Sequence, residues 1–223
     1  MKKLFFFAAA AFAALSLNAQ QIIFTEADID IDDLNGYVFE SDGLQLTCTD
    51  LNAKMVVDGN NAYFGDASEQ IKFEYRLKSG GKSTSKNCLK LTAPKAGKLY
   101  IYARSGSNDA TDRNLVVSQF GEEKFNQIVK ESDAVEVPGM DSKDPEKMTK
   151  VYPVISFDVA AGDIDITYPV GSMNFYGFAL GAPVAPQGFE NATVDNKAEK
   201  LFENGQLVII KNGVKYNALG AQL

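Results

Sequence analysis

The sequence contains no histidine and no tryptophan, and it contains only two cysteines. Without histidine, the chain cannot form a Ser-His-Asp triad, a Cys-His dyad, a His-ligated zinc site or an imidazole proton shuttle. These absences exclude many familiar hydrolase and metalloenzyme mechanisms.

Positive charge is also scarce, with 22 basic against 29 acidic side chains and a formal net charge of −7. Because phosphates attract Lys and Arg, we expect no nucleic-acid partner. A glycosidase needs a pair of carboxyl groups, but with so many carboxylates in the chain some pair is always available. No Glu lies in a distinctive apolar run that would raise its pKa, so the sequence does not indicate a glycosidase. The sequence therefore predicts a protein that is not an enzyme.

The first 19 residues have the pattern of a secretory signal peptide. Lys2 and Lys3 precede a short apolar run that ends near Leu17, and small residues lead to cleavage after Ala19. A retained membrane anchor is the alternative, but the run is short for a span. Cleavage removes two lysines and changes the formal charge from −7 to −9. No later apolar stretch is long enough to span a membrane, so we expect a secreted or outer-surface protein, with the periplasm as the second choice.

A period of two residues dominates the rest of the chain. Residues 72–78, 99–104 and 163–168 have side chains that alternate between two faces, which is typical of strands with one buried face. Residues 121–131 fit either a short helix or a strand with a turn. Weaker strands are expected at residues 37–40, 44–49, 54–57, 89–92, 114–119, 151–159 and 173–180. Turns are expected at residues 42–43, 58–61, 79–81, 95–97, 161–162 and 170–171. We predict an all-β fold, an antiparallel β-sandwich over residues 20–182.

The C-terminal part has a different character. Residues 183–200 contain Pro, Gly, Asn, Asp and Lys and are expected to form a linker. Residues 201–223 are expected to form a C-terminal β-hairpin, because Asn212-Gly213 separates two short apolar runs. Residues 138–150 are a charged insertion that we interpret as a solvated loop.

The two cysteines leave two alternatives open. Export to an oxidising compartment allows a disulfide between Cys48 and Cys88. The alternation, however, places Cys48 in register with apolar neighbours and Cys88 out of register with its own. Two buried thiols are the other interpretation.

Tyr100, Tyr102 and Arg104 share one strand face, opposite Leu99, Ile101 and Ala103. Tyrosine rings can stack on the apolar face of a sugar ring, and guanidinium gives planar hydrogen bonds, so this stripe is the candidate ligand-binding site. The lack of Trp favours a Tyr-lined groove over a flat platform. The alternative is that a loop or neighbouring segment packs over this face.

An acidic run at residues 28–33 raises the question of calcium. An EF-hand loop that starts at Asp28 requires Gly and Glu where the chain has Asp33 and Phe39, so that motif fails. A structural calcium held by a few of these carboxylates stays open, and no metal ligand is assigned. The other interpretation is that Ile29 and Ile31 pack inward while the Asp side chains remain in water.

Three segments resemble a β-sandwich module found beside pectate lyases in secreted proteins of polysaccharide-degrading anaerobes. They are YRLKSGG (75–81), GKLYIYARS followed by DRNL (97–105, 112–115), and AGDIDI running into MNFYGF (161–166, 173–178). The resemblance implies a jelly-roll-like sandwich with a non-catalytic, glycan-facing role.

The end of the chain, FENGQLVIIKNGVKYNALG (202–220), is similar to the C-terminal tails of type IX secretion cargo. This resemblance implies recognition by export machinery at the outer membrane, with attachment at the cell surface as a further implication. The alternative is an ordinary hairpin that completes the fold.

Together these features favour a secreted or cell-surface, non-catalytic β-sandwich that contacts a polysaccharide. The alternative from another class is a structural or adhesive surface protein with no small ligand. No cofactor is expected apart from the open question of calcium.

Overall fold

The computed structural model describes residues 20–83, 86–139, 144, 146–185, 199–203, 206–211 and 214–217. The predicted signal peptide lies outside these residues, as does the turn at Asn212-Gly213. The chain divides into two units, Met1–Pro186 and Gln187–Leu223, and each is described by itself. No helix within the described ranges has the length and apolar character needed to cross a membrane.

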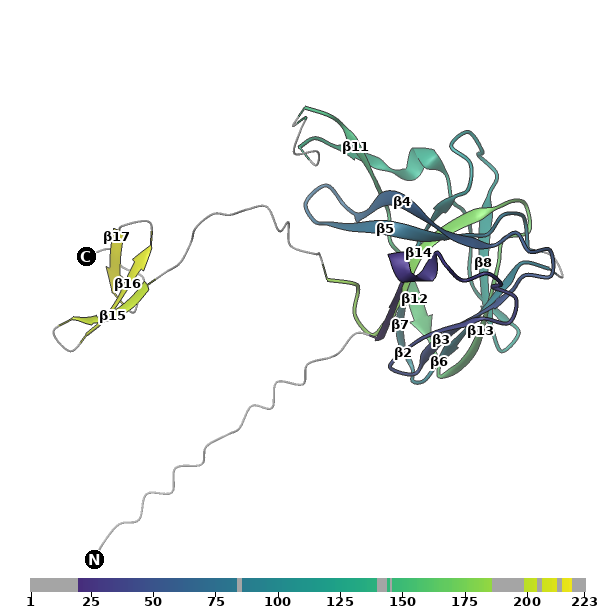
Figure 1. Ribbon diagram of the computed structural model, residues 1–223, viewed down its shortest axis with the longest axis horizontal. Coiled ribbons are helices and arrows are strands. Elements are labelled where there is room, and N and C mark those ends of the chain that lie inside the picture. Colours follow the sequence, from purple (N-terminus) through teal and green to yellow (C-terminus); the bar gives the residue numbers. More distant parts are fainter. Residues whose placement is uncertain are drawn as a thin grey trace, which may run out of the picture. The chain divides into compact units, whose positions relative to one another are not determined.

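The first unit contains an eight-stranded sheet and a six-stranded sheet (Figure 1). Across the larger sheet the strands are β10 (Val135–Val137), β11 (Thr149–Tyr152), β4 (Val56–Gly65), β5 (Gln70–Lys78), β14 (Met173–Leu180), β7 (Gly97–Ser105) and β12 (Ile155–Val159), and β1 (Gln20–Ile23) pairs with β14. Across the smaller sheet they are β2 (Val38–Ser41), β3 (Leu44–Thr49), β6 (Cys88–Ala93), β13 (Gly162–Thr167), β8 (Asn114–Gln119) and β9 (Glu122–Ile128). Two short 3-10 helices, η1 (Glu26–Asp28) and η2 (Glu131–Asp133), complete the unit.

The pairing is antiparallel throughout these two sheets, except that β4 and β11 run parallel. The predicted antiparallel β-sandwich is therefore confirmed. The main core lies between the sheets, because strands such as β3, β6 and β13 send alternate apolar side chains inward. Leu99, Ile101 and Ala103 of β7 are buried there, as are Leu89 and Leu91 of β6.

A second buried cluster lies against the opposite face of β7 and β14. Tyr102 and Tyr176 point to this face, and Phe64 and Phe73 pack on them with ring centroids 4.8–6.3 Å apart. Tyr152 from β11 completes the aromatic contacts. Both faces of the larger sheet therefore carry apolar packing, which the alternating pattern of β7 alone does not predict.

Two local predictions are wrong. Residues 58–61 do not form the expected turn but belong to β4. The pairing register of β4 with β5 shifts between Gly59 and Ala62, and the strand continues in the same direction. Such an irregularity accommodates extra residues within a continuous strand. Ile29 does not pack inward, since 43% of its surface is exposed. Ile31 does pack against the main core.

The segment at residues 121–131 is resolved in favour of a strand with a turn. β8 and β9 form a hairpin whose connecting residues are Phe120 and Gly121, and η2 follows β9. Similarly, residues 151–159 split into β11 and β12 around Pro153. The ends of the charged insertion at residues 138–150 lie in and beside β10 and β11.

No disulfide joins Cys48 to Cys88. Cys48 pairs in register with Leu89, whereas Cys88 pairs with Thr49, so the two side chains point to opposite faces of the smaller sheet. Burial, with the nearby charge of Asp50 in support, raises the pKa of the Cys48 thiol to about 12. The structure favours the buried-thiol alternative for Cys48.

Cys48 should therefore resist alkylation in the folded protein, since thiolate is the reactive form and its raised pKa leaves little of it near neutral pH. We expect iodoacetamide to label Cys48 only after denaturation, without any reducing agent, as measured by peptide mass spectrometry. A peptide pair linked through Cys48 and Cys88 would contradict this prediction.

The second unit is a three-stranded antiparallel sheet. It contains β15 (Glu199–Glu203), β16 (Gln206–Lys211) and β17 (Val214–Asn217). The expected hairpin corresponds to β16 and β17, and β15 is an additional strand that begins within the segment predicted as a linker.

Candidate functional site

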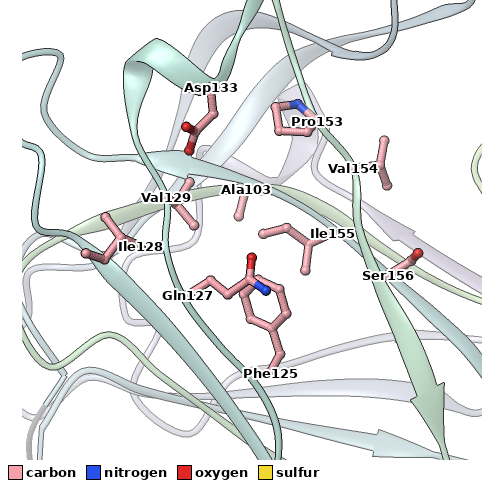
Figure 2. A pocket seen from close by; sticks show the side chains of 10 residues that line it. All are labelled: Ala103, Phe125, Gln127, Ile128, Val129, Asp133, Pro153, Val154, Ile155 and Ser156. Carbon is pink, nitrogen blue, oxygen red and sulfur yellow. The ribbon is translucent and has the colours of Figure 1, made fainter.

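A pocket of about 270 Å³ opens between the edge strands of the two sheets (Figure 2). β9 is the last strand of the smaller sheet and β12 the last strand of the larger one. The pocket is lined by Ala103, Phe125, Gln127, Ile128, Val129, Asp133, Pro153, Val154, Ile155 and Ser156. Ligand sites are usually concave and combine apolar side chains with a few polar groups, and this lining contains both kinds.

The pocket has an apolar middle and polar groups at its ends. Figure 2 shows Phe125 and Gln127 at one end, Asp133 and Pro153 at the other, and Val129 facing Ile155 between them. The Phe125 ring stacks on Phe157 of β12, with centroids 5.8 Å apart. One carboxylate oxygen of Asp133 accepts a hydrogen bond from the Lys130 backbone N–H, 2.9 Å away, so η2 fixes this side chain. The pocket can thus contact both the apolar and the hydroxyl-bearing faces of a ligand.

The last residue of β8 is hydrogen-bonded to the residue that follows β12. The Gln119 side chain donates from Nε2 to the Ala160 carbonyl and accepts from the Ala160 N–H through Oε1, both at 2.9 Å. Gln119 is only 1% exposed, so these hydrogen bonds are largely screened from water. This contact joins the β8 end of the β8–β9 hairpin to the chain just beyond β12.

The wall formed by Val129 and Asp133 is attached to the larger sheet through Arg104. The Arg104 guanidinium lies 3.2 Å from the Glu131 carboxylate, and their side chains are 13% and 12% exposed. Tyr152 donates a hydrogen bond to the other oxygen of Glu131 at 2.6 Å. Since Glu131 and Asp133 both belong to η2, this ion pair positions one side of the pocket.

Arg104 also binds the strands beside it. Its Nε donates to the Tyr176 hydroxyl at 3.1 Å, and one terminal nitrogen donates to the Tyr152 hydroxyl at 3.1 Å. Asn60 of β4 accepts from the other terminal nitrogen at 3.5 Å and from the Tyr176 hydroxyl at 2.6 Å. The Arg104 network therefore joins β7, β14, β4, β11 and η2.

This network shifts the protonation equilibria of its members. Burial acts to raise the pKa of Glu131, but hydrogen bonds from Tyr152 and Lys150 and the charge of Arg104 outweigh it and lower that pKa. Burial and the acceptor Glu131 raise the pKa of Tyr152. At neutral pH the network thus consists of an ionised Glu131, a cationic Arg104 and a neutral Tyr152.

The predicted stripe of Tyr100, Tyr102 and Arg104 does share one face of β7, but the face is largely covered. Tyr102 has no exposed surface, and its hydroxyl accepts a hydrogen bond from the Val184 N–H at 2.8 Å. Tyr100 is half-buried against the second cluster. Direct ligand contact by this stripe stays a prediction, and the contacts observed for Tyr102 and Arg104 are structural.

No group of three or more His, Cys, Asp or Glu that could hold a metal ion occurs among the described residues. Asp28 is engaged in η1, where its carboxylate accepts hydrogen bonds from the Thr25 N–H and hydroxyl. The structural calcium considered for residues 28–33 stays a prediction.

The pocket residues escaped prediction because they come from distant parts of the chain. Phe125 and Gln127 lie in a segment whose pattern fits helix and strand almost equally, and Ile155 lies 30 positions further on. Only the pairing order of the two sheets places their last strands side by side. One signal in the sequence could have indicated the pocket. Phe125 and Phe157 are each the aromatic residue of a short strand with charged neighbours, so their rings are candidates to pack against each other.

Comparison with known proteins adds little to this geometry. No protein-family model and no curated protein matches the chain. One similar solved structure comes from work on the Ruminococcus flavefaciens cellulosome, whose complexity is said to reflect "an expansion in glycan recognition". That chain is 14% identical, the match covers 61% of this chain and 80% of that one, and the TM-score is 0.31. A likeness at this level supports no conclusion about the site.

Proposed function

We propose that the first unit is a non-catalytic polysaccharide-binding module that acts outside the cell or at its surface. The observation that carries this proposal is the pocket between β9 and β12. Its lining combines the Phe125 ring with the Gln127 amide and the Asp133 carboxylate. A sugar ring has apolar C–H faces and a rim of hydroxyl groups, so it matches this combination of an aromatic surface and hydrogen-bonding ends.

The sequence supports the extracellular part of the proposal. The N-terminal segment has signal-peptide character, and the tail is similar to type IX secretion cargo, so export machinery is the proposed partner of residues 201–223. The binding role itself needs no cofactor, because hydrogen bonds and stacking are sufficient for sugar recognition.

Binding should be detectable as retardation of the mature protein in native gels that contain soluble polysaccharides, with affinities measured by titration calorimetry. Asp133→Asn keeps an acceptor for the Lys130 N–H but removes the charge. A hydrogen bond to a charged group contributes about 1.5–3 kcal/mol, so we expect affinity to fall about tenfold or more. Asp32→Asn, at an exposed position that does not line the pocket, is the matched control.

A further comparison separates the pocket from the tyrosine stripe. If Tyr100→Phe, at the partly exposed tyrosine of the stripe, weakens binding while Asp133→Asn does not, the ligand contacts the β7 face and the pocket assignment is wrong. If no pectin, xylan or glucan is bound by the wild-type protein, the glycan proposal fails. The structural or adhesive role would then be the better explanation.

A further inference from the structure

Phe120 combines two unusual properties at the tip of the β8–β9 hairpin. Its side chain is 73% exposed, the largest value among the exposed large apolar residues described. Its φ angle is +55° and that of Gly121 is +79°, the two positive values of a type I′ turn. Asn, Asp or Gly is preferred at the first of these positions, whereas a bulky aromatic residue there is an outlier. The turn geometry therefore does not explain why phenylalanine occupies this position.

The position of Phe120 is nevertheless well defined. A Cβ atom on Gly162 would lie 3.3 Å from Cζ of Phe120, so the end of the ring sits above the backbone of Gly162. The neighbouring Gln119 is fixed by its two hydrogen bonds to Ala160. The hairpin tip thus holds an aromatic ring in a fixed place and leaves most of it open to water.

Phe120 and the pocket are on the same hairpin. From Phe120 to Phe125 the chain follows β9. The distance is roughly 13 Å at about 3.3 Å per residue, because the irregularity near Val117 takes up one residue of β9. β12 runs beside β9, and the Phe125–Phe157 stack joins the two strands along this stretch. An extended ligand that enters the pocket can therefore follow this edge to the hairpin tip.

We propose that Phe120 is a stacking site for a second sugar ring of a neutral oligosaccharide whose other end occupies the pocket. This inference rests on the proposed function and specifies its ligand as a chain of several units. Stacking of a sugar on the exposed ring gives a reason for a bulky residue at a position where the turn prefers Asn, Asp or Gly. The geometry thus assigns two separated contact points to one glycan.

The charges along this edge favour a neutral chain. β9 carries Glu122 and Glu123, β12 carries Asp158, and all three are exposed. Lys124 of β9 is paired with Glu122 at 2.9 Å, and Lys98 of β7 lies opposite Asp158, so the acidic groups still outnumber the basic ones. A uronic-acid polymer would meet net repulsion here, whereas a neutral xylan or glucan would not.

The test is a calorimetric titration with xylo- and cello-oligosaccharides from the monosaccharide to the hexasaccharide. Phe120→Asn supplies the residue that the turn prefers, so Tm should stay the same or rise by up to about 3 °C. We expect wild-type affinity to increase with chain length. In Phe120→Asn the gain for the longer oligosaccharides should be lost, about tenfold for the hexasaccharide, with the shortest binding ligand unaffected. Leu51→Asn, at another exposed apolar position, is the control and should bind like the wild type.

The outcomes separate this inference from the function on which it rests. If no oligosaccharide of either series binds, the proposed function fails first. If oligosaccharides bind but Phe120→Asn keeps the dependence on length, the glycan role stands and the stacking site is wrong. An equal loss at every length would also overturn the inference, because Phe120 would then act on the first sugar site. Tighter binding of polygalacturonate than of xylan would contradict the neutral ligand.

Discussion

Replacement of Arg104 by methionine should lower the free energy of unfolding by about 3 kcal/mol. Methionine keeps much of the apolar stem but leaves the carboxylate of Glu131 without its guanidinium partner in a largely buried place. The ion pair is 3.2 Å long, with side chains 13% and 12% exposed. Removal of one member of such a pair is costly because the remaining charge stays desolvated. Chemical denaturation followed by circular dichroism measures the effect.

Lys150→Met provides the matched control. Lys150 lies 3.2 Å from the same carboxylate of Glu131, but its side chain is 46% exposed. An exposed ion pair contributes at most about 1 kcal/mol, so this variant should differ little from the wild type. Equal losses in the two variants would contradict a special role for Arg104. The double variant Arg104→Met with Glu131→Gln should recover part of the loss, since no unpaired charge then remains.

The same ion pair gives stability a defined pH dependence. The pKa of Glu131 is lower in the folded protein than its ordinary value. The stabilisation by Glu131 is thus complete above the ordinary pKa and is lost as pH falls through the lowered folded value. The difference in stability between the wild type and Glu131→Gln should shrink over this acidic interval.

Replacement of Phe64 by alanine should be still more damaging, with an expected loss of about 3–5 kcal/mol. Phe64 is fully buried and its ring contacts Phe73, Tyr102, Tyr152 and Tyr176. The substitution removes most of the side chain and leaves a cavity that the surrounding rings cannot fill. Thermal unfolding should show a decrease in Tm of roughly 10 °C.

Phe120→Ala is the control for this prediction, because it is the same substitution at a position with 73% exposure. A surface change of this kind normally alters stability by no more than about 0.5 kcal/mol. If the two variants were equally stable, the aromatic cluster outside the main core would not contribute to folding.

The sequence predicts the individual strands well because burial on one face imposes a period of two. The strand expected at residues 173–180 has the same bounds as β14, and the strand expected at residues 44–49 has the same bounds as β3. The inward and outward sides of β7 also follow from alternation. Local side-chain patterning is therefore sufficient to predict a strand and the face that it buries.

The sequence does not predict what covers the outer side of the larger sheet. Alternation places Tyr102 and Arg104 away from the main core, but a polar or aromatic outer residue can face either water or a second layer. That choice depends on Tyr152 and Val184, which lie far along the chain. The candidate pocket could not be predicted for the same reason, because its position follows only from the order of the strands in both sheets.

The unpaired edges of β9 and β12 have a consequence for solubility. Within the described part of the chain each strand hydrogen-bonds on one side only, so its other side is a template on which a neighbouring molecule could add a strand. Acidic side chains along both edges, Glu123 and Asp158 among them, oppose such an approach by like-charge repulsion. A protein kept at high concentration should therefore tend to aggregate as salt screens these charges. The two edges that border the ligand pocket must therefore also be protected from pairing with other copies of the chain.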